Sequence, residues 1–346
     1  MLGFQEKLES QLANLFSPFE TEKEWQEFQK KTDLELEQIL NEVALITSIA
    51  TINESPGDLK VVRKKINQFE QNLRHFWRLP LDRLEILIWV AFEAGMQFNR
   101  EFRNAAAESN DHVFEALTRL HAKACQTSLA ILTLLKSGFA DDAFARWRSL
   151  HEISVIGSFI SKNGQELAEK YLLHRPIQQY KIMCAQIKVH GRNSEEEVSQ
   201  EDMVVLEDLH DKLIKRFGKS FSSDYGWAVE TLKKNRPTFR DIEEIVGLDH
   251  FRPYYRMASD NVHANSHGLY YRMGINQDDG KILLGGPSNA GLEGPGHDTA
   301  ISLMQITISL LLTRPSVPTN ITATILTTLA REAGYAFAQT HRKLEP

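Results

Sequence analysis

The chain has 346 residues, enough for one large domain or two ordinary ones, and its 42% hydrophobic and 25% charged residues are typical of a globular protein. The formal net charge of −6 excludes recruitment of nucleic acid or an anionic membrane by the overall field, so such contacts would need a local basic patch. Cys125 and Cys184 match no metal-ligand spacing, which predicts a reducing compartment without a disulfide framework. No cationic-then-apolar leader opens the sequence and no apolar run is long enough to span a bilayer. We therefore expect a cytoplasmic protein without a membrane segment.

Residues 1–80 are predicted to form an N-terminal helical region that packs against the rest of the chain or mediates oligomerisation. The spacing of apolar residues predicts amphipathic helices over residues 2–16, from the possible capping box at Thr21 to about Ile52, and over residues 59–79. The turn residues at 55–58, Ser-Pro-Gly-Asp, predict a break between the last two helices.

Residues 81–346 are predicted to form the main domain. Two long apolar stretches, from Leu81 and from His112, indicate core helices, and Lys136-Ser137-Gly138 separates the second from the next helix. Further helices are predicted at 141–159, 166–189, 200–217, 249–267, 299–313 and 320–342. A short helix is also predicted, opened by Asn235-Arg236-Pro237-Thr238 and ended by Gly247. The only strands expected form a small β-hairpin near residues 269–285, beside a glycine-rich loop. The predicted fold class is therefore all-α, a multi-helix bundle with one small hairpin.

Two of these predicted helices carry polar stripes. Arg148 and Glu152 lie four residues apart on the helix at 141–159. In the helix at 249–267, Tyr255 belongs to an apolar face beside a polar stripe. The members of that stripe recur at helical spacing: Arg252, Arg256, Ser259, Asp260, His263 and His267. We expect the two helices to pack together and to build one polar site from Arg148, Glu152, Arg256 and His263.

The phrase LLKSGFADDAFARWRSLHE is followed about a hundred residues later by SDNVHANSHG. Through these phrases, residues from about 90 to 285 resemble an uncharacterised family of bacterial helical proteins, catalogued as a domain of unknown function. In this family an Arg-x3-Glu helix and a later Ser-x3-His segment recur. They correspond here to Arg148 with Glu152 and to Ser259 with His263. The resemblance implies that the four residues share a site, and it brings no established activity.

The spacing of Arg256 and His263, with six residues between them, resembles the Arg-x4–6-His motif of HEPN-type ribonucleases, which are all-helical proteins of bacterial toxins and phage-defence systems. This resemblance implies metal-independent cleavage of RNA at a homodimer interface, and a cognate antitoxin or defence-system partner. Arg256 would hold the phosphate and His263 would act as acid and base on the ribose 2′-OH. Met257 departs from the polar residue that often follows the arginine. Neighbouring polar residues would bind the substrate: Arg252, Ser259, Asn261 and His267.

Two other interpretations stay open. His263 and His267 could hold a metal with Glu152 or Asp260, but the sequence has no His-Glu-x-x-His pattern, so we expect neither a metal nor another cofactor. The alternative function is that of a non-enzymatic helical protein that binds a ligand or a partner. In that case Arg148, Glu152 and His263 belong to a structural polar seam, and an exposed Arg148–Glu152 ion pair contributes about 0.3–0.5 kcal/mol.

Overall fold

The computed structural model describes residues 4–16, 23, 26, 33–193, 200–270, 272–275 and 283–344. Contacts between residues divide the chain into two compact units, Met1–Asn72 and Leu73–Pro346. The described residues form helices and no strand, so the predicted all-α, multi-helix fold is confirmed. The predicted domains, 1–80 and 81–346, remain predictions. Among the described residues, no helix combines the length and the apolar character that a membrane span requires.

The first unit contains α1 (Phe4–Phe16) and most of α3 (Asp33–Phe76). The predicted break at residues 55–58 is wrong, because α3 is one continuous helix with Pro56 in its interior. A proline removes a single backbone hydrogen bond and crowds one carbonyl, so the flanking turns can continue the helix at a cost of about 3 kcal/mol. Gly57 follows within the same helix, and it also lowers helical stability relative to alanine.

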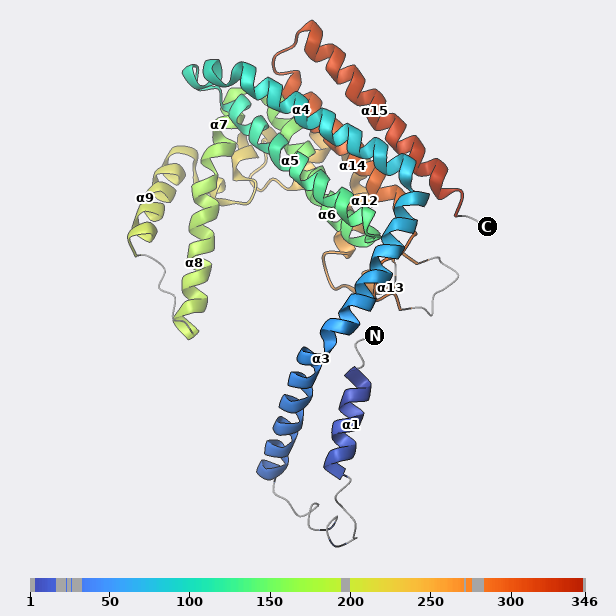
Figure 1. Cartoon of the computed structure of the whole chain (residues 1–346). Helices are drawn as coiled ribbons and strands as arrows, with labels where there is room; N and C mark the ends of the chain where they lie inside the picture. The colour runs from blue at the N-terminus through green and yellow to red at the C-terminus, as the bar shows by residue number, and fades with distance from the viewer. Residues whose placement is uncertain are drawn as a thin grey trace. The chain divides into compact units, whose positions relative to one another are not determined.

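Five long helices form the core of the second unit (Figure 1). They are α4 (Arg78–Glu108), α5 (His112–Lys136), α6 (Ala140–Asn163), α14 (Glu293–Leu311) and α15 (Val317–His341). Helix α14 contacts the other four, and α4 also packs against α15. The largest side chains that are fully buried belong mainly to these helices or to their ends, among them Trp77, Phe144, Trp147 and Phe337. The apolar runs of the sequence thus become the faces that pack around α14.

Shorter helices follow α6 along the chain. They are α7 (Gln165–Leu173), α8 (Arg175–Asn193), α9 (Gln200–Phe217), η1 (Lys219–Ser222), η2 (Gly226–Ala228), α10 (Val229–Leu232) and α11 (Phe239–Val246). The helix expected at 166–189 is therefore two helices, and Pro176 stands in the first turn of the second, where a proline is tolerated. Helix α11 follows its sequence signals. Thr238 forms a capping box with Asp241, and Gly247 ends the helix with a φ of 78°.

The single helix predicted at 249–267 is wrong. The chain forms η3 (Asp249–Phe251), α12 (Arg252–Asp260) and α13 (Ser266–Tyr270). The Asp260 carboxylate accepts hydrogen bonds from Asn265 Nδ2 (2.6 Å) and His267 Nδ1 (2.8 Å), and Asn265 Oδ1 accepts from Gly268 N (2.8 Å). These local bonds end α12 and begin α13, because short polar side chains compete with the helical backbone pattern. His263 N still donates to Ser259 O (3.1 Å), so His263 lies one turn beyond Ser259.

The small β-hairpin predicted near residues 269–285 is not seen. Leu269 and Tyr270 are helical, in α13, and residues 272–275 and 283–285 contain no strand. Residues 271 and 276–282, which include the predicted turn, lie outside the described residues. Met273 N donates to Asp141 Oδ1 (2.9 Å), so this backbone group bonds to a side chain of α6 instead of to a partner strand.

Candidate functional site

A buried carboxylate links α6, α11 and α12. Glu243 on α11 has no solvent exposure, and neither has His151 on α6. Glu243 Oε1 accepts a hydrogen bond from His151 Nε2 (2.9 Å), and Glu243 Oε2 accepts one from Arg252 Nη1 (2.5 Å). Because carboxylate oxygens only accept, this geometry places a proton on Nε2 of His151. His151 Nδ1 is buried and has no hydrogen-bond partner among the described residues.

A second carboxylate, Glu152, links α6 with α12. Its Oε1 accepts from the Tyr255 hydroxyl (2.5 Å) and lies 3.3 Å from Arg148 Nε. The guanidinium carbons of Arg148 and Arg252 lie 4.8 Å and 5.1 Å from the centroid of the Tyr255 ring, within cation–π range. Tyr255 therefore contacts both arginines and hydrogen-bonds the carboxylate that pairs with one of them.

Burial and charge shift the pKa values in this network. Burial, followed by the hydrogen bond to Glu152, raises the pKa of the Tyr255 hydroxyl well above its usual value. Tyr225 also faces this charge, because burial and then the nearby Glu152 carboxylate raise its pKa to about 12. Burial lowers the pKa of Arg148, but Tyr255 and Glu152 together raise it more. Both tyrosines therefore keep their protons at neutral pH, and Arg148 keeps its charge.

Aromatic rings enclose His151. Its imidazole centroid lies 5.3 Å from that of Trp147, 5.5 Å from Phe251, and 6.0 Å from both Phe239 and Tyr255. This shell comes from α6, α11, η3 and α12, so it fixes the packing of these elements at one point. It also keeps water from the His151–Glu243 hydrogen bond, which strengthens that bond.

The structure joins some of the residues predicted for the site and not others. Arg148, Glu152 and Arg252 belong to the network around Tyr255 and Glu243. Arg256 and His263 are exposed, and within the described part of the chain no hydrogen bond or ion pair ties them to Arg148 or Glu152. The remaining predicted residues have local roles or settings. Ser259 Oγ donates to Tyr255 O (2.7 Å), His267 pairs with Asp260 (2.8 Å), and Asn261 is half-buried after the end of α12.

The contacts with α6 show the direction in which the later segment runs. Lys162 Nζ donates to Val246 O (3.1 Å), Tyr255 contacts Glu152, and Asp141 accepts from Met273 N (2.9 Å). Residues 246–270 and 272–273 therefore run back along α6, from its C-terminal end to its N-terminal end. Tyr255 lies beside Glu152 and Met273 lies beside Asp141. Arg256 and His263 come between Tyr255 and Met273 in the sequence, so they belong to the segment that runs from Glu152 toward Asp141.

Sequence reasoning missed three members of the network as site residues: His151, Tyr225 and Glu243. Glu243 had a detectable signal, because it occupies an inward position of α11. The buried residues of that helix follow the spacing i, i+3, i+4 and i+7: Phe239, Ile242, Glu243 and Val246. A glutamate in such a position demands a buried partner. The sequence pattern places Tyr255 on the apolar face, where it does lie, but the pattern does not reveal the hydrogen bond from its hydroxyl to Glu152.

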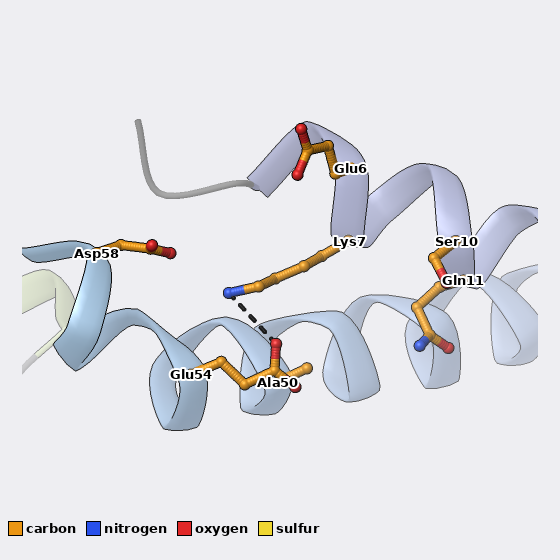
Figure 2. Close-up of a pocket in the computed structure, with 7 residues that line it drawn as sticks. All are labelled: Glu6, Lys7, Ser10, Gln11, Ala50, Glu54 and Asp58. Carbon is orange, nitrogen blue, oxygen red and sulfur yellow. Dashed lines mark ion pairs between the residues drawn. The ribbon is translucent and has the colours of Figure 1, made fainter.

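Metal-binding residues do not cluster in the described part of the chain, where no group of three or more His, Cys, Asp or Glu side chains is placed to hold an ion. In the first unit, a hollow of about 660 Å³ lies between α1 and α3 (Figure 2). Lys7 Nζ lies 3.5 Å from Glu54 Oε2 across it, and Glu6 and Asp58 add two further acids. We interpret this hollow as an ion-paired packing contact between the two helices.

Comparisons with known proteins find one family model that matches part of the chain. No curated protein and no solved structure matches the chain. Residues 114–282 match the model of a family of unknown function (DUF5677). The match begins in α5 and contains the whole network around Glu152 and Glu243, together with Ser259 and His263. The predicted resemblance to an uncharacterised helical family is thereby confirmed, and residues 114–282 are similar to the family of unknown function DUF5677.

Proposed function

We propose that the protein is a metal-independent RNA endonuclease whose reactive groups are Arg256, in the middle of α12, and His263, just after the end of that helix. One observation carries this proposal: these two side chains are exposed, on and just after a helix whose other arginine, Arg252, is anchored to a buried carboxylate. The network around Glu243 and Glu152 would hold α12 in place. The two exposed side chains would remain accessible to a substrate.

In the proposed reaction, His263 removes the proton from a ribose 2′-OH. The 2′-oxygen then attacks the adjacent phosphorus, and the bond to the 5′-oxygen breaks. The leaving 5′-oxygen receives that proton from the protonated His263, which gives a 2′,3′-cyclic phosphate and a 5′-hydroxyl end and restores neutral His263. Arg256 stabilises the additional negative charge on the phosphate oxygens. Arg252, Ser259, Asn261 and His267 would position the RNA beside it. The resemblance to HEPN-type ribonucleases adds a homodimer and a role as a toxin or phage-defence effector to the proposal.

Cleavage of a labelled single-stranded RNA by the purified chain, in the presence of EDTA, tests the proposal. We expect His263→Ala to cleave at least about 100-fold more slowly, because a positioned acid–base group contributes about 10²–10⁴-fold. His250→Ala is the matched control, since His250 is another exposed histidine just before α12. Its cleavage should equal that of the wild type. A wild-type chain without activity, or an active His263→Ala variant, would refute the assignment. Growth arrest with RNA degradation on expression of the wild type alone would support the effector role.

A second candidate function is a non-enzymatic protein that binds a ligand or partner. The observation that favours it is that Glu152 pairs with Arg148 and accepts a hydrogen bond from Tyr255, as expected of a structural seam. Under this interpretation Glu152→Ala lowers the stability of the fold. Neither the wild type nor a His263 variant cleaves RNA. The stability and cleavage measurements on the same two variants therefore separate the two candidates.

A further inference from the structure

A groove of about 310 Å³ lies between α4 and α5, built from residues other than those of the α6–α12 network. This volume is at the lower end of the range for small-molecule sites. Helix α4 contributes one face at the spacing i, i+3, i+4, i+7 and i+11: Phe92, Gly95, Met96, Asn99 and Arg103. Leu310 of α14, which is fully buried, also lines the groove.

One end of the groove is cationic. Arg103 donates to Glu115 Oε2 (2.6 Å) and to Asn99 Oδ1 (3.0 Å), and Arg119 Nε pairs with the other oxygen of Glu115. Two guanidinium groups thus share one carboxylate, which leaves an excess of one positive charge. Each guanidinium still has N–H groups that these bonds do not use. The arrangement suits a further anion with one negative charge.

The other end is apolar. Helices α4 and α5 are antiparallel here, because Arg103 meets Glu115 while Gly95 lies against His121. Phe92 and Met96 therefore face the part of α5 that carries Ala122 and Cys125. The eleven-residue step from Phe92 to Arg103 corresponds to about 16 Å along α4. The groove is thus elongated, with its charge at one end.

The buried polar groups beside the apolar end are neutral. Thr307 Oγ1 donates to Leu303 O (2.7 Å), so it accepts from His121 Nε2 (3.1 Å), and His121 Nδ1 is left as an acceptor. Burial lowers the pKa of His121 to about 4 and raises the pKa of the Cys125 thiol to about 12. Neither group is charged at neutral pH, so both can border a hydrocarbon chain without exposing a charge to it.

We propose that this groove binds a small organic monoanion with an apolar chain, of the class of medium-chain carboxylates. The head group bonds to Arg119 and Arg103, and the chain lies along Phe92 and Met96, over the buried Leu310. This site goes beyond the proposed RNA cleavage, because none of its residues belongs to the network around Glu152.

Calorimetric titration of the full chain with decanoate tests this site. We expect saturable binding of one decanoate per chain, and binding at least about tenfold weaker for acetate and for 1-decanol, because each lacks one of the two contacts. Arg119→Gln removes a head-group donor and should weaken decanoate binding about tenfold. Ala122→Phe places a ring in the groove from an exposed position and should abolish binding. Arg100→Gln is the matched control, since Arg100 is exposed on α4 outside the groove.

Circular dichroism spectra should be the same for all three variants, which separates loss of binding from loss of fold. The proposal is overturned if decanoate does not bind at up to about 1 mM. It is also overturned if decanoate binds to Arg119→Gln and Ala122→Phe as it does to the wild type, since binding would then be nonspecific. Equal binding of decanoate and 1-decanol would show an apolar site without the assigned anion contact.

Discussion

Glu243 is a single buried side chain on which two helices depend, because both of its oxygens accept from groups on other elements. We expect Glu243→Gln to lower the free energy of unfolding by about 3–5 kcal/mol, since it leaves Arg252 without its carboxylate and sets an amide N–H₂ among donors. Urea denaturation measures the change. Glu244→Gln is the matched control on the same helix, because Glu244 forms an exposed ion pair with Arg240. Its effect should stay within about 0.5 kcal/mol. Equal effects of the two variants would contradict the role of the Glu243 network.

At the scale of residues, sequence patterns located part of the network and missed its centre. Arg148 and Glu152 were identified from a spacing of four on one helix, which is local information. The Tyr255–Glu152 contact joins residues 103 positions apart, and it depends on how α12 is placed along α6. The spacing of residues within either helix does not determine how the two helices are aligned with each other. His263 was assigned to a continuous helix, whereas Asp260 and Asn265 form local bonds that end α12 before it.

At the scale of elements, the interior of α3 is a weak point that can be strengthened. Gly57 is helical and a Cβ added there meets nothing within 4 Å. We expect Gly57→Ala to stabilise this helix by about 1 kcal/mol, because alanine loses less backbone entropy. Hydrogen exchange of peptides that cover residues 50–62 should become slower.

Gly95→Ala is the opposite case on α4. A Cβ at that position would lie 2.3 Å from His121 Cε1, so either the ring or the helix must shift. Gly95→Ala should therefore make hydrogen exchange around residue 95 faster.

For α3, faster exchange in Gly57→Ala would contradict the prediction, because it would show that the turn at 55–58 does not keep its helical backbone.

The helices with a clear 3.6-residue period were predictable, and those controlled by single residues were not. The runs that became α4, α5 and α6 have apolar faces that bury the core, so periodicity found them. Pro56 was interpreted as a stop, although a helix can continue past a proline at a cost. Conversely, the predicted hairpin rested on a run of apolar and aromatic residues, and Leu269 and Tyr270 of that run form the end of a short helix begun by Asn265.

For the molecule as a whole, the apolar surface of α3 leads us to expect a homodimer. Leu45, Ile49 and Ile52 lie on one face at the spacing i, i+4 and i+7, with 61%, 48% and 72% of their surface exposed. Exposed apolar stripes of this kind usually mark an interface. Light scattering should give twice the mass of the chain at micromolar concentration. The double variant Ile49→Glu, Ile52→Glu should give the monomer mass.

Ile325→Glu controls for the general effect of a charge on an exposed isoleucine, because Ile325 lies on α15 in the second unit and is 47% exposed. This variant should remain a dimer. A monomeric wild-type chain, or a double variant that stays dimeric, would count against α3 as the interface.

The pairing of α4 with α15 determines when the second unit can complete its core (Figure 1). Arg83 Nη1 donates to Glu332 O (3.0 Å), 249 residues later in the sequence. A ribosome that adds about 5–20 residues per second needs about 12–50 s for that interval. During this time Trp77, which packs against Phe337, lacks its partner. The nascent chain therefore carries an unfinished apolar surface until α15 emerges, which is longer than in a protein whose helices pack in the order of their synthesis.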